Sequence, residues 1–422
     1  MNIILLWRIG RKILPWILLL ALISRRSDRL TTPQFWAEDG KVFFAQAYGA
    51  GWSIWFQPYA GYFLLVPRII AWLWAGLPWQ WTPLAYNASA LAVWAYIICR
   101  IGAARLPAAF RWLAAAAMVC TIHSGEVFLN ITNLQWPLAL LLAVNLLEPP
   151  PRGPQETVHR CIESVIAGLT GPLVLVASAG ALARAFSLHR RREGWFLLAA
   201  FFATAVLQGL AYATGDRAVT ATVATAGKEL IEVFPLYSAY LAGAGFFNGW
   251  SGLCLMLIGL GWSAMIALAI HRGLRPKDRW RMLAILLGAA ACLAAARMRR
   301  GMWVGPLDLG NARYTYVPLV LMMWLLAWIA SQGTVRAIRR ISLVLFVIGL
   351  LSGLPLWRGY EETNYHWPSQ VAEAESGERR SFVVPPGFQF PVPTGKDLPQ
   401  TSAGDGSIQR GRHFWFVVDG RD

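Results

Sequence analysis

Charged side chains are scarce in this chain of 422 residues. They make up 14% of it, whereas about 25% is usual for a soluble protein. Hydrophobic residues make up 56%, and the mean hydropathy is +0.45. The few charges cluster between long apolar runs, as expected when each run crosses roughly 30 Å of hydrocarbon. The composition therefore excludes an ordinary soluble protein and predicts an all-α polytopic membrane protein.

Acidic residues are scarcer than basic ones, 22 against 38, which gives a net charge of +16. This balance would suit a nucleic-acid partner, but the sequence contains no soluble basic domain and no nucleic-acid-binding motif. Cytoplasmic loops of membrane proteins are rich in Lys and Arg, which explains the charge. We therefore predict a lipid environment and no nucleic acid.

Cysteine is also scarce, and no two of the five cysteines have metal-ligand spacing. Each lies inside or at the edge of an apolar run, so we interpret them as small membrane-buried side chains. They are Cys99, Cys120, Cys161, Cys254 and Cys292.

About nine apolar runs are long enough to be spanning helices. They are residues 3–24, 82–100, 107–123, 134–148, 195–213, 250–270, 281–297, 314–331 and 340–357.

Two further apolar regions are ambiguous. Residues 55–80 contain three prolines and Arg68, which favours helices lying in the interface plane. Residues 161–186 are broken at Gly171-Pro172, so they form either one bent helix or a re-entrant pair. An interfacial 55–80 and a re-entrant 161–186 place more Lys and Arg in the inner loops than the other combinations do.

This arrangement gives the predicted topology. The transmembrane domain is 1–357, with a cytoplasmic N-terminus and a first outer loop over 25–81. Residues 358–422 form a small extracytoplasmic tail of short strands or extended segments, since the tail is polar and rich in proline.

The first outer loop carries an unusual acidic pair, Glu38-Asp39. Carboxylates beside apolar membrane cost free energy unless they are hydrated or paired. They could take a proton from a sugar hydroxyl or bind a divalent cation. Alternatively, they simply favour the positive end of a helix over 41–48.

The outer turn over 123–136 is crowded with hydrogen-bonding side chains. Amides can reach sugar hydroxyls, and an indole face can stack on a sugar ring. The alternative is a self-satisfied turn between helices. The candidate residues are His123, Glu126, Asn130, Asn133, Gln135 and Trp136.

A third group consists of outer arginines that violate the positive-inside trend. Arg299, Arg300 and Arg313, with Lys228, suggest a fixed anion, because Arg binds phosphate through two parallel hydrogen bonds. Pairing with outer carboxylates or headgroups is the alternative. Three further exceptions are predicted to contact lipid headgroups, namely Arg25, Arg26 and Arg29.

The order of these features resembles the GT-C superfamily of membrane glycosyltransferases, which use polyprenyl-phosphate sugars. Glu38-Asp39 occupies the place of that family's acidic pair. The stretch 58–62 is similar to its Pro-x-Ala-Gly-Tyr segment, and Arg313-Tyr314 to its Arg-Tyr element. Gly168-Leu169-Thr170-Gly171-Pro172 resembles its Thr-Lys-Gly stretch without the basic residue. The resemblance covers roughly 1–330.

The resemblance implies an inverting transferase of the bacterial inner membrane, acting on its outer face. Asp39 or Glu38 would be the base. The donor phosphate would be held by Arg299, Arg300, Arg313, Tyr314 and Lys228. The acceptor or sugar would be contacted by Tyr59, Tyr62, His123, Glu126, Asn130, Asn133 and Gln135.

The sequence specifies no cofactor, and a divalent cation at the acidic pair stays an open alternative; because the loop lacks Asp-x-Asp, a metal centre of the oligosaccharyltransferase kind is disfavoured. The acceptor is a glycan, lipid or protein. The alternatives are a lipid-linked glycan polymerase or ligase, which would need a larger outer loop, and a flippase or transporter, which would show internal repeats.

Overall fold

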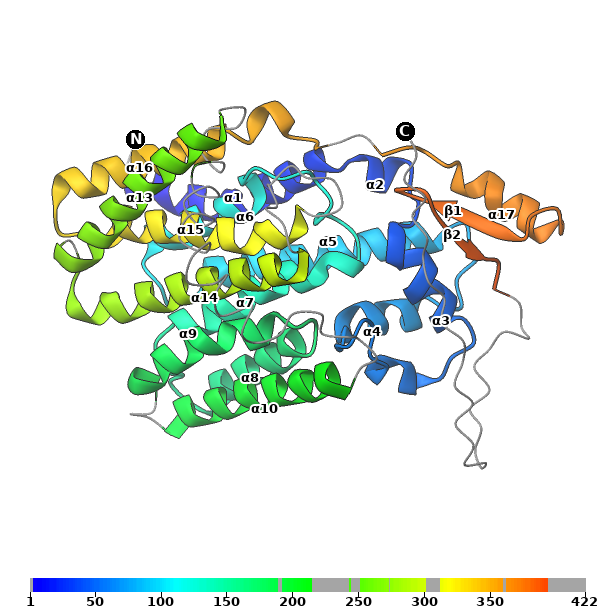
Figure 1. Cartoon of the computed structure of the whole chain (residues 1–422), viewed down its shortest axis with the longest axis horizontal. Helices are drawn as coiled ribbons and strands as arrows, with labels where there is room; N and C mark the ends of the chain where they lie inside the picture. The colour runs from blue at the N-terminus through cyan, green and yellow to red at the C-terminus, as the bar shows by residue number, and fades with distance from the viewer. Residues whose placement is uncertain are drawn as a thin grey trace.

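The computed structural model of the chain describes residues 3–188, 192–214, 243, 251–272, 274–300, 312–359 and 362–393. Nine of the described helices coincide with the nine predicted apolar runs. They are α1 (Ile3–Arg25), α5 (Thr82–Ala103), α6 (Ala108–Cys120), α7 (Gln135–Leu147), α10 (Arg192–Thr214), α13 (Gly252–Arg272), α14 (Pro276–Arg300), α15 (Arg313–Gln332) and α16 (Arg336–Leu351). They form one elongated bundle whose helices run along its long axis (Figure 1).

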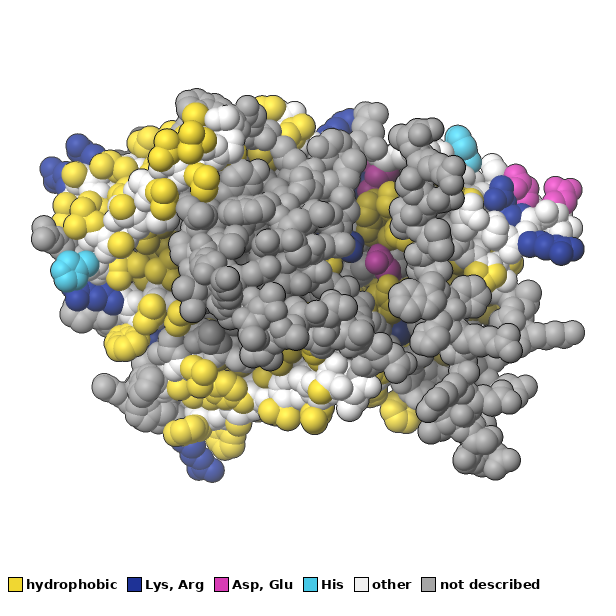
Figure 2. All heavy atoms as spheres, in the orientation of Figure 1, with side chains coloured by type: hydrophobic (Ala, Val, Ile, Leu, Met, Phe, Trp, Pro, Cys, Tyr) yellow, Lys and Arg dark blue, Asp and Glu magenta, His cyan; other side chains and the backbone are white. Residues whose placement is uncertain are grey.

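Five helices in the described part of the chain are long and apolar enough to cross a membrane, namely α5, α10, α13, α15 and α16. Figure 2 shows hydrophobic side chains over the bundle and basic side chains at its left end, the distribution that a bilayer favours. The count of nine spans and the orientation of the termini stay predictions.

The first loop, predicted to hold interfacial helices, contains only short helical pieces. They are α2 (Asp28–Thr31), the π-helix η1 (Asp39–Phe44), α3 (Ala45–Ala47), the 3-10 helix η2 (Trp52–Phe56) and α4 (Leu65–Leu73). Nine residues of α-helix extend only about 14 Å, so α4 cannot cross a bilayer. Residues 55–80 therefore contain no spanning helix.

The ambiguous region near Gly171 is a hairpin of two helices, α8 (Pro154–Gly168) and α9 (Leu173–Leu188). In α8, Arg160 donates to the carbonyl of Asn145, and in α9 Arg184 donates to that of Leu146, both near the end of α7. The connection between them lies at the opposite end of α7, where Gly171 approaches Gln135. The chain therefore reverses at this connection, and a single bent helix is excluded.

An ionic cluster joins α5, α7 and α8 at the end of the bundle marked by Glu148. Arg100 lies 2.6 Å from Glu148 and 2.8 Å from Glu163. The other oxygen of Glu148 accepts the backbone N–H of Arg105 at 2.5 Å. Glu148 and Glu163 are both buried and share Arg100, so removing either would take away one of the two counter-charges of this arginine.

Residues 362–393 form a small subdomain on the first loop at the other end of the bundle, visible on the right of Figure 1. It consists of α17 (Trp367–Glu375) and an antiparallel pair, β1 (Ser381–Val384) and β2 (Phe388–Pro391). Phe35 packs against Trp367 with ring centroids 4.8 Å apart. The expected short strands are thus present; the chain beyond 393 lies outside the described residues.

We predict that Glu148→Gln lowers the free energy of unfolding by about 2 kcal/mol, because it weakens the charged hydrogen bonds that Glu148 accepts from Arg100 and from the N–H of Arg105. Chemical denaturation in detergent micelles measures this. Glu378→Gln, a change at an exposed position, is the control and should have little effect. Equal stability of the two variants would contradict a structural role for the cluster.

Candidate functional site

Asp39 is fixed to the outer turn by three hydrogen bonds. One carboxylate oxygen accepts the backbone N–H of Thr132 at 2.8 Å and its hydroxyl at 2.5 Å. The other accepts the N–H of Ile131 at 3.4 Å. Asp39 is fully buried at the start of η1. The first loop and the turn, 93 residues apart in sequence, therefore meet at this carboxylate.

Burial raises the pKa of the Asp39 carboxyl from its ordinary 3.8 to about 6. The hydrogen bonds from Thr132 and the positive charge of Arg29 oppose this effect, while Glu38 adds to it. Desolvation prevails because the side chain is wholly removed from water. Asp39 consequently gains or loses its proton close to neutral pH, where an acid–base group is most useful.

Glu38 differs from its neighbour because it is only partly buried. Its Oε2 is inside the protein and has no hydrogen-bond partner in the described part of the chain. Its charge acts on Arg313 at the start of α15 and on Lys41. Of the acidic pair, Glu38 is the carboxylate that an added molecule can reach.

Arg313 joins the same site through Glu126 of the turn. One oxygen of Glu126 accepts the backbone N–H of Arg313 at 3.1 Å and lies 3.7 Å from its Nε. The guanidinium of Arg313 also lies 5.4 Å from the ring centroid of Tyr314. The acidic pair and Arg313-Tyr314 thus both contact the outer turn, through Asp39 and Arg313.

The side-chain amides that were predicted to bind sugar make their hydrogen bonds to other groups of the turn. Asn130 and Asn133 both donate to the carbonyl of Glu126, at 2.6 and 2.8 Å. The Asn130 side chain also accepts the N–H of Asn133, whose oxygen in turn accepts the indole N–H of Trp136. Both amides are fully buried, so in this conformation they maintain the turn.

His123 is also buried in the turn. Its Nδ1 accepts the N–H of Gly125 at 3.0 Å, so the neutral ring carries its proton on Nε2. Burial and the nearby charge of Arg25 lower the pKa of His123 to about 3. A ring that stays neutral at physiological pH is a weak base, so its geometry suits support of the turn.

Buried arginines at the end of α1 donate hydrogen bonds to the backbone of the outer turn, whereas the sequence assigned them to lipid headgroups. That prediction was wrong. Arg25 is buried and donates to the carbonyls of Val119, Thr121 and His123. Its positive charge offsets the unpaired carbonyls at the end of α6.

Arg26 and Arg29 are equally buried, for a different reason. Arg26 donates to the carbonyl of Gly125 and lies 2.6 Å from Glu362. Arg29 lies 2.5 Å from the same carboxylate. The two arginines thereby tie the C-terminal subdomain to the bundle, because Glu362 begins that subdomain.

Tyr59 and Tyr62 form the ends of a tight turn in which Ala60 and Gly61 both have positive φ. Two positive φ values in succession define a type I′ turn, which favours glycine.

The segment after this turn packs against the break between α8 and α9. Leu64 pairs with Thr170. The side-chain amide of Gln208 in α10 donates to the carbonyls of Phe63, Gly168 and Gly171. The Pro-Tyr-Ala-Gly-Tyr stretch and the Thr-Gly-Pro break are therefore neighbours, with Gln135 beside Gly171.

The C-terminal subdomain covers the acidic pair. The N–H of Ala37 donates to the carbonyl of Pro385 at 2.8 Å. A side chain added at Gly40 would collide with the ring of Phe390. In Figure 2, acidic and basic side chains are visible among hydrophobic ones between the bundle and this subdomain.

Three predicted anion-binding groups cannot be placed. Lys228 and the side chains of Arg299 and Arg300 lie outside the described residues. Within the described residues, no group of three His, Cys, Asp or Glu side chains is arranged to hold a metal ion. The sequence missed Thr132 and the buried arginines, whose contacts involve distant segments.

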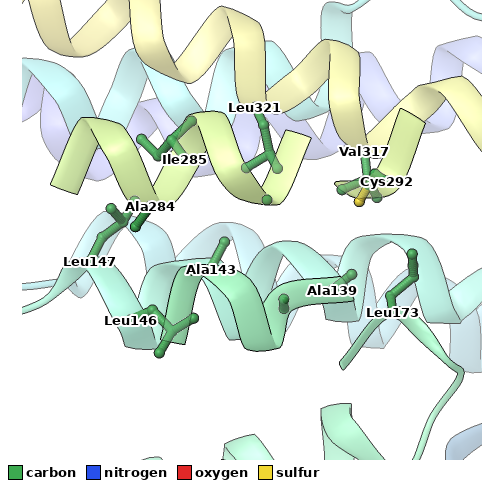
Figure 3. A pocket seen from close by; sticks show the side chains of 13 residues that line it. Ala139, Ala143, Leu146, Leu147, Leu173, Ala284, Ile285, Cys292, Val317 and Leu321 are labelled. Carbon is green, nitrogen blue, oxygen red and sulfur yellow. The ribbon is translucent and has the colours of Figure 1, made fainter. Parts of the chain in front are cut away.

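One cavity of about 40 Å³ lies away from these charges, between α7, α9, α14 and α15. Figure 3 shows its lining of small and aliphatic side chains, including Ala143, Leu173 and Leu321. It offers no hydrogen-bonding side chain apart from the weak thiol of Cys292. The cavity therefore offers an apolar space and is not lined by Glu38, Asp39 or Arg313.

No protein-family model, curated protein or solved structure matches the chain.

The raised pKa of Asp39 predicts a pH-dependent stability difference between the wild type and Asp39→Asn. A raised folded-state pKa means that the folded protein binds the proton more tightly than the unfolded chain does. The resulting stabilisation is complete below about 3.8 and is lost as pH rises through about 6. From pH 4 to 7, the wild type should lose about 2 to 3 kcal/mol relative to Asp39→Asn. Parallel denaturation curves measure this; a difference that does not change with pH would contradict the burial of Asp39.

Proposed function

We propose that the protein is a membrane glycosyltransferase that moves a sugar from a polyprenyl-phosphate carrier to an acceptor hydroxyl on the extracytoplasmic face. The observation that carries the proposal is the meeting of the acidic pair with Arg313 on one turn. Chemically, this combination offers a proton acceptor and a phosphate-binding cation side by side. The sequence resemblance to GT-C enzymes supports the same activity.

In this proposal Glu38 is the general base and Asp39 is a positioning residue. Glu38 is the more accessible carboxylate, and one of its oxygens has no hydrogen-bond partner among the described residues. Asp39 accepts hydrogen bonds from Thr132 and so fixes the start of η1.

The reaction is a single in-line displacement. Glu38 takes the proton of the acceptor hydroxyl as its oxygen attacks the anomeric carbon, and the bond to the polyprenyl phosphate breaks. The phosphate leaves with the electron pair, and Arg313 stabilises the charge that develops there. One displacement inverts the anomeric centre. Arg299, Arg300 and Lys228 are proposed to contribute to the same phosphate site.

The proposed setting is a multi-pass protein of a bacterial inner membrane, with the N-terminus in the cytoplasm and the C-terminus outside. The buried polar turn supports only the membrane part of this setting, because non-helical backbone near membrane depth is tolerated only where protein encloses it. α6 and α7 are 13 residues each, about 20 Å. These helices are shorter than the roughly 30 Å of the hydrocarbon core, so the turn between them would begin at membrane depth.

We predict that Glu38→Gln lowers sugar transfer by about 10²- to 10⁴-fold, because the acceptor loses its base. Proteoliposomes that contain a polyprenyl-phosphate sugar measure transfer directly. Asp39→Asn should lower transfer less, and Glu378→Gln, at an exposed position, should leave it unchanged.

Wild-type transfer by both Glu38→Gln and Asp39→Asn would refute the assignment. A wild-type enzyme that moves the intact donor between leaflets without consuming it would instead indicate a flippase.

A further inference from the structure

Arg68 is a buried cation that neither the sequence motifs nor the proposed mechanism uses. It lies in the first turn of α4 with its side chain 1% exposed. Its Nη1 donates to Oε1 of Gln46 at 2.6 Å, and its guanidinium lies 5.4 Å from the ring centroid of Phe43. Tyr59 is the only titratable group that acts on its charge in the described part of the chain.

The other buried arginines are compensated far better. Arg26 and Arg29 contact Glu362, Arg160 lies near Glu148, and Arg313 lies near Glu126. Arg25 contacts three carbonyl oxygens, and Arg184 contacts two. Arg68 has a single neutral amide oxygen. A buried charge without a counter-charge costs several kcal/mol, so Arg68 is the described arginine that most needs an anion.

The free edge of this guanidinium has a defined geometry. Because Nη1 is used by Gln46, the edge formed by Nε and Nη2 remains. Nε is buried and has no acceptor within the described ranges. Two parallel N–H groups on that edge match two oxygens of a phosphate. Although burial lowers the pKa of Arg68 to about 10, the side chain is still charged at neutral pH.

The surroundings of Arg68 place such an anion at the membrane surface. Several large apolar side chains near α4 are exposed, including Trp52, Phe56 and Leu73. This pattern is typical of helices that lie among lipid headgroups.

Phe43, beneath Arg68, follows Asp39 by one turn of η1, and α4 packs against Thr132–Leu134. The helix that carries Arg68 therefore lies beside exposed apolar side chains and packs against η1, the helix that begins at Asp39.

We propose that Arg68 binds a phosphate group carried by a lipid. The idea that this phosphate belongs to the sugar donor rests on the proposed function. The idea that Arg68 binds a lipid phosphate does not rest on it. A phospholipid headgroup has the same chemistry, so the test uses both sources.

The test is ligand binding to the full chain in nanodiscs, with farnesyl phosphate as the probe and farnesol as the probe without phosphate. Arg68→Gln should weaken binding of farnesyl phosphate by about tenfold or more and leave farnesol binding unchanged. Arg340→Gln, an exposed arginine on α16, is the matched control. Gln46→Ala should keep binding, since it leaves the guanidinium in place.

Wild-type binding of both farnesyl phosphate and phosphatidic acid by folded Arg68→Gln would overturn the proposal. If that variant does not fold, Arg68→Lys decides: it keeps the charge but lacks the two-donor edge, so weaker binding supports the proposal and wild-type binding overturns it. A second set of nanodiscs contains phosphatidic acid. In these nanodiscs the phosphatidic acid bound to the protein is measured. A loss of phosphatidic acid binding alone assigns the site to a bilayer headgroup, which still supports the proposal. The two proposals are tested separately. Sugar transfer by Glu38→Gln tests the proposed function, whereas farnesyl phosphate binding by Arg68→Gln tests the phosphate site.

Discussion

The contact between Asp39 and Thr132 is the constraint on which the site depends. A fully buried carboxylate is costly, and this one is stabilised by the hydroxyl and backbone N–H groups of a turn far away in the sequence. The same turn supplies Glu126, which orients Arg313. Through one turn, the first loop and the start of α15 acquire fixed positions relative to each other.

Buried arginines make such a turn possible within a helical bundle. The carbonyls left free at the end of α6 need donors, and Arg25 supplies them. Arg26 binds the turn and Glu362 together, so the C-terminal subdomain and the turn share one cation. This subdomain covers the acidic pair and contributes to the desolvation that raises the pKa of Asp39.

Local sequence patterns predicted the helices well, because apolar runs and prolines act over short distances. Pro58 and Pro67 correctly indicated that 55–80 would not form one long helix, and Gly171-Pro172 correctly indicated a break. The partners of polar residues were harder to predict. Glu362 is 333 residues from Arg29, and no local pattern connects them, so the arginines after α1 were wrongly assigned to headgroups. Likewise, the composition of the turn suggested ligand contacts for Asn130 and Asn133, whereas their amides are used by neighbouring backbone groups.

The central claim is that the first-loop carboxylates and Arg313 occupy one site on one side of the membrane. Cross-linking tests it most directly, with cysteines introduced at positions 38 and 313 in a chain whose native cysteines have been replaced. A short, membrane-impermeant bifunctional thiol reagent added from the extracytoplasmic side should join the two positions in high yield. Reaction of the two cysteines from opposite sides of the membrane, with no cross-link, would contradict the account.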